Sequence, residues 1–233
     1  GYGVYLLASS IFDDSSKKYS VISGFFYMFN VYTLVMVWHR FLYSTMVLAA
    51  ALPFLILFWR KWVKDGKFFD LTIFLLINFL SVYMYGNLAS VIAVWTALTL
   101  ISLAEMFFPW QGKFNVWKLS GRFLAGFILW LLTNMWWIAP TFSIAPGLLP
   151  EQHSSEDNLG TLVSISRQTI MPYLLQLANP FYLFYRQELG QIYSSFIFKV
   201  IPWIMSAVIF AGMIASLKLK NYAKYSMVFI AAV

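Results

Sequence analysis

The sequence predicts an all-α fold, a polytopic helical membrane protein with about six to eight transmembrane helices and one long extracytoplasmic loop containing interfacial helices. Three observations lead to this prediction. Hydrophobic residues make up 61% of the 233-residue chain and charged residues only 11%, whereas about 25% of a soluble domain is charged. Apolar runs recur near the roughly 20 residues that a helix needs to cross a bilayer core. These runs are apolar on all sides, so they do not show the alternation of barrel strands.

The apolar segments are joined by mostly short connections. Residues 1–141 are predicted to hold transmembrane helices, residues 142–195 an extracytoplasmic loop with an interfacial amphipathic segment, and residues 196–233 further transmembrane helices. The first run is too short to span and the last one simply stops, so we expect an internal piece of a longer membrane protein. The predicted spans are Gly1–Ile11 (a tail), Ser20–Trp38, Phe41–Trp59, Phe68–Tyr85, Leu88–Phe108, Phe123–Pro140 and Phe196–Leu217, with a last one from Met227.

The distribution of basic residues assigns these connections to the two sides of the membrane. Lys and Arg are concentrated in the first, third, fifth and seventh connections and are scarce, for their length, in the others. Since cytoplasmic loops carry the excess of Lys and Arg, the odd connections are predicted to face the cytoplasm. Their basic residues are Lys17, Lys18, Arg60, Lys61, Lys64, Lys67, Lys113, Lys118, Arg122, Lys218, Lys220 and Lys224.

The one long even connection, Thr141–Ser195, is therefore predicted to be extracytoplasmic. Its first part is rich in turn residues and contains the acidic stretch Glu151–Asn158. Thr161–Ala178 is apolar, and Asn179–Arg186 supplies four aromatic residues. Because aromatic side chains favour the headgroup level, this second half is predicted to lie along the outer membrane surface.

Composition also excludes several functions. The net charge of +7 lies in the connections rather than on a basic face, and no recognition motif is present, so nucleic acid is not expected as a partner. The absence of Cys removes thiol catalysis and Cys-ligated metal sites. With His39 and His153 as the only histidines, no metal site and no cofactor are predicted within this chain. A divalent metal would have to be held by residues upstream of Gly1.

Few polar side chains fall inside the predicted spans. Asp70 and Glu105 are predicted near cytoplasmic ends, where water or the nearby Lys67 and Lys113 satisfy them. No ionisable group is then expected at mid-membrane, which disfavours an ion-coupled transporter. Amides remain that need partners at membrane depth, at Asn30, Asn78 and Asn134.

The outer side carries few basic residues, and two interpretations of them stay open. His39 and Arg40 lie at the outer end of a span, where a guanidinium can hold the phosphate of a lipid-linked substrate by paired hydrogen bonds. Alternatively, Arg40 contacts ordinary phospholipid headgroups. In the long loop, Arg167 and Arg186 bind an anionic ligand or pair with the acids Glu188 and Asp157.

A second feature of the outer side is the helix-end motif Asn134–Pro140, which closes a predicted span. The aromatic belt at the membrane interface accounts for Trp136 and Trp137. Pro140 is expected to end the helix, because a proline cannot supply the backbone donor that continues it.

Two segments together resemble a known family. Ser23–Tyr32 reads Ser-Gly-Phe-Phe-Tyr-Met-Phe-Asn-Val-Tyr, and Asn134–Thr141 reads Asn-Met-Trp-Trp-Ile-Ala-Pro-Thr. They resemble the membrane portion of bacterial and archaeal glycosyltransferases of the GT-C superfamily, particularly the arabinofuranosyltransferase-like and YfhO-like groups. Ser164–Thr169, followed by a Leu- and aromatic-rich segment, is similar to the later part of their outer loop. Val31 departs from the pattern, since the family often has Pro there.

The resemblance implies a multi-pass protein of a bacterial or archaeal plasma membrane. Such a protein transfers a sugar from a polyprenyl-phosphate-linked donor to a cell-envelope glycan or lipid acceptor on the extracytoplasmic side. The family's catalytic acid would precede Gly1, and within this chain Asp157 and Glu188 are the candidates for a general base. Two alternatives stay open, a transporter or flippase of lipid-linked glycans and an O-antigen polymerase or ligase. The expected clamp on the donor phosphate consists of His39, Arg40, Arg167 and Arg186.

Overall fold

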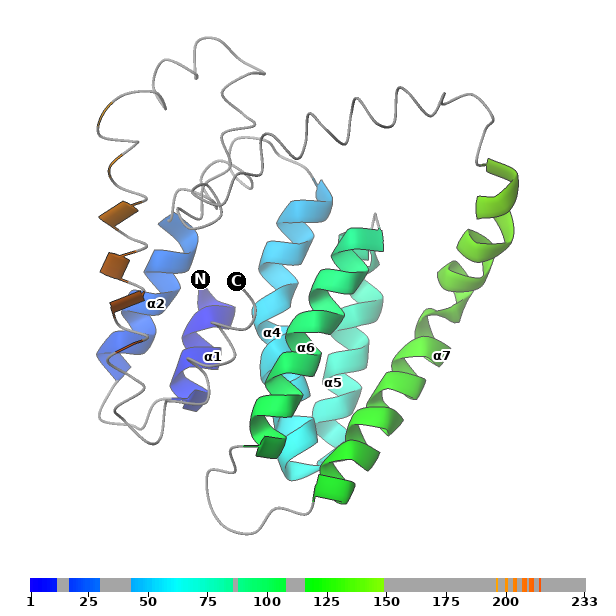
Figure 1. Cartoon of the computed structure of the whole chain (residues 1–233), viewed down its shortest axis with the longest axis horizontal. Coiled ribbons are helices and arrows are strands. Elements are labelled where there is room, and N and C mark those ends of the chain that lie inside the picture. The colour runs from blue at the N-terminus through cyan, green and yellow to red at the C-terminus, as the bar shows by residue number, and fades with distance from the viewer. Residues whose placement is uncertain are drawn as a thin grey trace. The chain divides into compact units, whose positions relative to one another are not determined.

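The computed structural model describes residues 1–11, 17–29, 43–85, 88–107 and 116–148, together with isolated residues between 196 and 214. Over these residues the fold is all-helical, as predicted, and contains no strand. The elements are α1 (Tyr2–Ile11), α2 (Lys17–Phe29), α4 (Tyr43–Asp65), α5 (Phe68–Leu80), the short 3₁₀ helix η3 (Val82–Tyr85), α6 (Leu88–Phe107) and α7 (Val116–Leu148), shown in Figure 1.

Two of the described helices are long and apolar enough to cross a membrane. They are α4, with 23 residues, and the part of α7 from Val116 to Thr141, with 26 residues. Each exceeds the roughly 20 residues that a bilayer core requires. Shorter apolar helical segments are Tyr2–Ile11, Phe68–Leu80 and, within α6, Ser90–Met106. The length and composition of α4 and α7 are compatible with a membrane environment.

By its backbone packing the chain divides into two compact units, Gly1–Asn134 with Ser216–Ala232, and Met135–Ala215 with Val233. In the first unit α4 lies at the centre and contacts α1, α5, α6 and η3, while α2 packs on α1. Helices α1, α4 and α6 end where α2, α5 and α7 begin, at the lower end of Figure 1. The helix ends that flank the first, third and fifth predicted connections therefore lie together, as an alternating chain requires.

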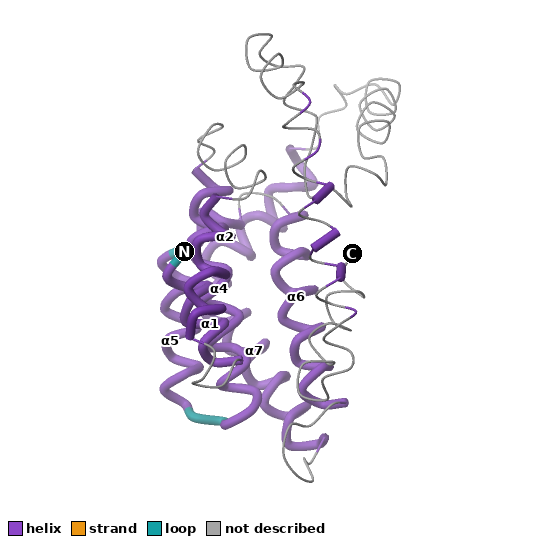
Figure 2. Tube along the Cα trace, turned by 90° about the vertical axis from the view of Figure 1, so that its left-hand side faces the viewer, coloured by secondary structure: helices purple, strands orange, loops and turns teal. Residues whose placement is uncertain are grey.

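The turn between α4 and α5 depends on one glycine and one arginine. Gly66 has a φ of 72°, which L side chains rarely adopt, and its N–H donates to the Trp62 carbonyl at 2.8 Å. The Arg122 guanidinium, from α7, donates to the carbonyls of Val63 at 2.9 Å and Lys64 at 2.6 Å. These carbonyls lie in the last turn of α4, where no helical N–H remains for them. Arg122 therefore caps α4, and the turn is the teal segment at the lower end of Figure 2.

An aromatic cluster forms the core around α4. Trp59 is fully buried, and its ring centroid lies 4.9 Å from that of Phe74 and 5.4 Å from that of Trp95. Phe123 of α7 adds an edge-on contact to Trp59 at 5.5 Å. The Trp59 indole N–H donates to the Ser102 hydroxyl at 2.8 Å, which joins α4 to α6. Tilted and edge-on ring pairs such as these stabilise a core beyond the area they bury.

Tryptophan side chains of α4 pack directly against the α7 backbone at Gly126. A Cβ atom at this position would lie 2.7 Å from Cζ3 of Trp59 and 3.0 Å from Nε1 of Trp62. The Trp62 indole is itself held by a bond to the Arg122 carbonyl at 3.0 Å. The absence of a side chain at Gly126 therefore permits the contact between the two helices.

Two predicted spans differ from the helices observed. Helix α4 continues six residues past Trp59, through Asp65, so Arg60 lies inside a helix rather than in a connection. The predicted span Phe68–Tyr85 is divided, because α5 ends at Leu80 and η3 follows. The tighter turn of η3 brings Tyr85 back toward α5, where its hydroxyl bonds to Asn78.

Pro140 does not end α7, in contrast to the prediction, since the helix continues to Leu148. Neighbouring hydroxyls bond to carbonyls around the proline. Thr141 Oγ1 donates to the Trp137 carbonyl at 2.7 Å, and Ser143 Oγ donates to the Ala139 carbonyl at 2.8 Å. The carbonyl that loses its helical donor at Pro140 is that of Trp136, four residues earlier, so these two hydroxyls bond to other carbonyls and do not replace that bond.

Candidate functional site

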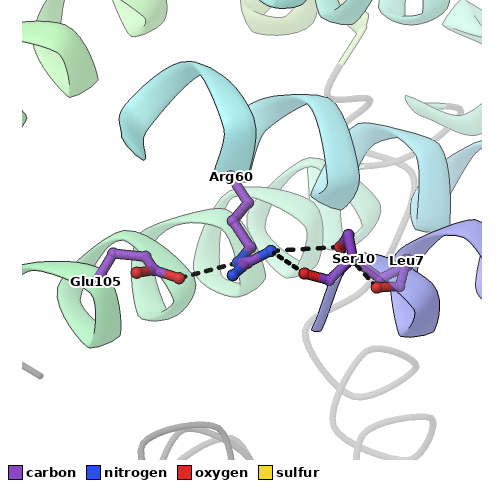
Figure 3. A network of polar contacts seen from close by, with 4 residues as sticks. All are labelled: Leu7, Ser10, Arg60 and Glu105. Carbon is purple, nitrogen blue, oxygen red and sulfur yellow. Dashed lines mark hydrogen bonds and ion pairs between the residues drawn. The ribbon is translucent and has the colours of Figure 1, made fainter. Parts of the chain in front are cut away.

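The first of two buried polar centres is an ion pair between α4 and α6. Arg60 Nε donates to Glu105 Oε1 at 2.9 Å, and the two side chains are only 6% and 3% exposed. Arg60 Nη1 also reaches the carbonyl of Ser10 at 3.2 Å and its hydroxyl at 3.3 Å, and Ser10 Oγ donates to the Leu7 carbonyl at 2.7 Å. Figure 3 shows the guanidinium between the carboxylate and α1. The network ties together the carboxyl-terminal ends of α1, α4 and α6.

This geometry corrects the prediction for Glu105. The carboxylate is buried and bonded to Arg60, which the charge pattern had assigned to a connection. Burial of two charges is costly unless they are paired and hydrogen-bonded, and both conditions are met. Asp70 is likewise buried, at 7% exposure, rather than open to water. It lies in the first turn of α5, where a carboxylate is favoured by the helix dipole.

The second centre surrounds the amide of Asn78, which is fully buried in α5. Its Oδ1 accepts one hydrogen bond from the Tyr85 hydroxyl and one from the Trp130 indole N–H, the latter at 3.1 Å. Its Nδ2 donates to the Phe74 carbonyl at 3.0 Å. Two donors on the oxygen and an acceptor on the nitrogen fix the orientation of the amide. The predicted need of Asn78 for a partner is met by side chains from η3 and α7.

Asn134 is fully buried one turn further along α7 from Trp130. Its Nδ2 donates to the Trp130 carbonyl at 2.9 Å and contacts Thr133 Oγ1 at 3.3 Å. The amide predicted to need a partner is thus bonded within its own helix. The amide nitrogen of Asn134 is therefore satisfied by α7 itself.

Removal of the Tyr85 hydroxyl is expected to have a modest effect. In Tyr85→Phe the Asn78 oxygen keeps its bond from Trp130, and loss of the bond from the Tyr85 hydroxyl is expected to lower the unfolding free energy by about 1 kcal/mol. The measurement is unfolding of the purified chain in mixed detergent micelles, followed by tryptophan fluorescence. Tyr83→Phe is the control, because Tyr83 is 64% exposed. Equal losses in both variants would refute the role assigned to the Asn78 bond.

The structure places only part of the sequence-predicted site. Trp136 is 57% exposed, Trp137 is half-buried, and both lie with the exposed Pro140 on the continuous helix α7. None of the side chains of the expected phosphate clamp, nor either candidate acid, falls in the described part of the chain. Outside it lie His39, Arg40, Asp157, Arg167, Arg186 and Glu188.

Sequence reasoning missed the residues that the fold does bring together. Glu105 is the only charged residue of the apolar segment Leu88–Phe107, and such an acid signals a buried partner. Arg60 stands between Trp59 and Lys61 in a basic stretch, so its burial has no clear signal in the sequence. Among the described residues, no group of three or more His, Asp or Glu side chains is placed to hold a metal ion.

Comparison of the chain with family models, with curated proteins and with solved structures found no match. The resemblance to GT-C glycosyltransferases therefore stays a prediction from the sequence.

Proposed function

We propose that the chain is the membrane-embedded part of a multi-pass GT-C-type glycosyltransferase. The membrane placement is supported by large apolar side chains that are exposed along one face of several helices. On α7 they recur every fourth residue, at Leu124, Ile128 and Leu132, with exposures of 56%, 46% and 64%. Positions four apart share a helix face, and a contiguous exposed apolar face is suited to lipid rather than water. A similar face on α2 consists of Ile22, Phe25, Phe26 and Phe29.

The position of the Asn134–Pro140 motif along α7 carries the functional proposal. Helix α7 begins at the same end of the bundle as the α4–α5 turn, which is flanked by Lys64 and Lys67. Asn134 follows Val116 by 18 positions (134 − 116), which is about 27 Å along an α-helix. That distance is close to the roughly 30 Å of a hydrocarbon core. A bilayer around this bundle would therefore place the motif near the surface opposite the basic end, where lipid-linked donors are used by the family it resembles.

The sidedness can be tested by labelling. The chain has no Cys, so Ser154→Cys introduces a unique thiol into the loop predicted to be extracytoplasmic. We expect a membrane-impermeant maleimide to label it in intact cells. A cysteine in place of Lys113, in the predicted cytoplasmic connection, should react only after the cells are opened. Labelling of the residue-154 thiol from the cytoplasmic side alone would contradict the topology.

The transferase activity can be tested at the clamp arginines. We expect Arg40→Ala and Arg167→Ala each to reduce sugar transfer by about 10-fold or more, because each removes a charge-assisted hydrogen bond to the donor phosphate. The assay uses membranes containing the full-length protein and a panel of radiolabelled polyprenyl-phosphate sugars. Lys18→Ala, on the predicted cytoplasmic side, is the control. Unchanged transfer in both arginine variants would remove the clamp from the proposal.

The Arg60–Glu105 pair favours one second candidate, a transporter of lipid-linked glycans. Ionisable residues inside a helical membrane bundle commonly mark ion or proton pathways. In this structure the two charges are bonded to each other at 2.9 Å, which suits a structural link between helices. A transporter would move a fluorescent lipid-linked sugar across vesicle membranes without any acceptor, whereas a glycosyltransferase would require the acceptor and release the lipid phosphate.

A further inference from the structure

One end of the first unit carries lysines beside strongly exposed aromatic rings. The rings belong to Trp117, Phe68 and Phe69, which are 86%, 68% and 73% exposed. Lys67 and Lys118 are exposed next to them in sequence, and Lys64 is half-exposed. We call this the basic-aromatic surface. It is formed by the α4–α5 turn, the first turn of α5 and the first turn of α7.

Hydrogen bonds hold these three segments together. The Arg122 guanidinium bonds to the carbonyls of Val63 and Lys64 and lies against Gly66, the residue that precedes Lys67. Lys118 is four residues before Arg122, so the two share one face of α7. The lysines of the α4–α5 turn and of α7 are therefore brought to one place by a fixed contact.

The charge of the surface is positive. Asp65 is exposed in the turn, and Asp70 is buried beneath it. Lys61, one turn earlier on α4, lies over the Phe58 ring at 5.5 Å and is thereby held along the helix. Arg122 is already engaged by the α4 carbonyls. Lys67 and Lys118 thus face a ligand, with Asp65 as the exposed acid near them among the described residues.

We propose that the basic-aromatic surface binds the headgroup of an anionic phospholipid, an inference that rests on the membrane placement proposed above. Ammonium groups attract anionic headgroups near a membrane surface. Aromatic rings favour the boundary between headgroups and acyl chains. Adjacent cations and exposed rings match the two parts of such a lipid, whereas a soluble anion would use only the cations. The rigid attachment of α7 through Arg122 makes this a defined site rather than a diffuse field.

The test is native mass spectrometry of the chain purified in a neutral detergent and titrated with phosphatidylglycerol or with phosphatidylcholine of the same acyl chains. We expect the wild-type chain to retain phosphatidylglycerol preferentially. Removing two charges in Lys67→Gln/Lys118→Gln should reduce that preference on the order of 10-fold. Lys18→Gln is the matched control, because Lys18 is exposed on α2 and outside the basic-aromatic surface.

Two outcomes would overturn the lipid site. In the first, the wild-type chain shows no preference between the two lipids. In the second, Lys18→Gln weakens the preference for phosphatidylglycerol as much per charge removed as the double variant does, and the attraction is then diffuse. The membrane proposal fails separately, if the chain expressed in cells is recovered from the soluble fraction. A chain that stays in the membrane fraction but binds both lipids equally refutes this inference alone.

Discussion

Arg60→Met is expected to destabilise the folded chain by about 3–5 kcal/mol, the usual consequence of removing one partner of a buried ion pair. Glu105 would keep its negative charge in a site where it is 3% exposed, with its bond from Arg60 Nε lost. The Ser10 carbonyl and hydroxyl would lose a donor at the same time. Three helix ends would therefore lose their common contact.

The double variant Arg60→Met/Glu105→Leu tests whether the loss of stability comes from the buried charge of Glu105 or from the lost hydrogen bonds. With both charges replaced by apolar side chains of similar size, stability should return to near the wild-type value or exceed it, because no charge is left buried alone. Unfolding in mixed detergent micelles, followed by far-ultraviolet circular dichroism, measures both variants. Lys61→Met is the control, since Lys61 is the next residue on α4 and is half-exposed. If the double variant were as unstable as Arg60→Met, the lost hydrogen bonds, and not the buried charge of Glu105, would account for the loss of stability.

Gly126→Val is expected to cost about 3 kcal/mol, at the upper end of what overpacking a well-filled core usually costs. The added Cβ would lie 2.7 Å from Cζ3 of Trp59, a distance that side chains do not tolerate without movement. Trp59 cannot shift freely, because its indole N–H is bonded to Ser102. Helix α7 would have to move away from α4.

The same helix supplies the control for this variant. A Cβ at Gly121 would meet no atom within 4 Å, so Gly121→Val should leave stability within about 0.5 kcal/mol of wild type, as for most surface substitutions. Thermal unfolding in detergent, monitored by tryptophan fluorescence, compares the two. If both valines destabilise equally, the loss comes from the residue type and not from contact with Trp59.

The helical class and the approximate positions of α4, α6 and α7 were predictable, because long apolar runs leave few alternatives to a helix. The side-chain partners were not. The excess of Lys and Arg in connections is a statistical signal, so it assigned Arg60 to a loop although that side chain turns inward to Glu105. The expectation that Pro140 ends its helix was wrong as well, because α7 continues to Leu148. The predicted phosphate-clamp residues lie outside the described segments, so their arrangement stays a prediction.

The Arg122 cap also bears on the order in which the chain assembles. The α4–α5 hairpin is synthesised before α7, and until α7 arrives the carbonyls of Val63 and Lys64 lack their guanidinium donor. The Asn78 oxygen likewise lacks its hydrogen bond from the Trp130 indole until α7 is present. A nascent chain that stops before α7 therefore holds an early hairpin whose two ends are both incomplete. Arrival of the single later helix α7 supplies the missing donors at both ends of the hairpin.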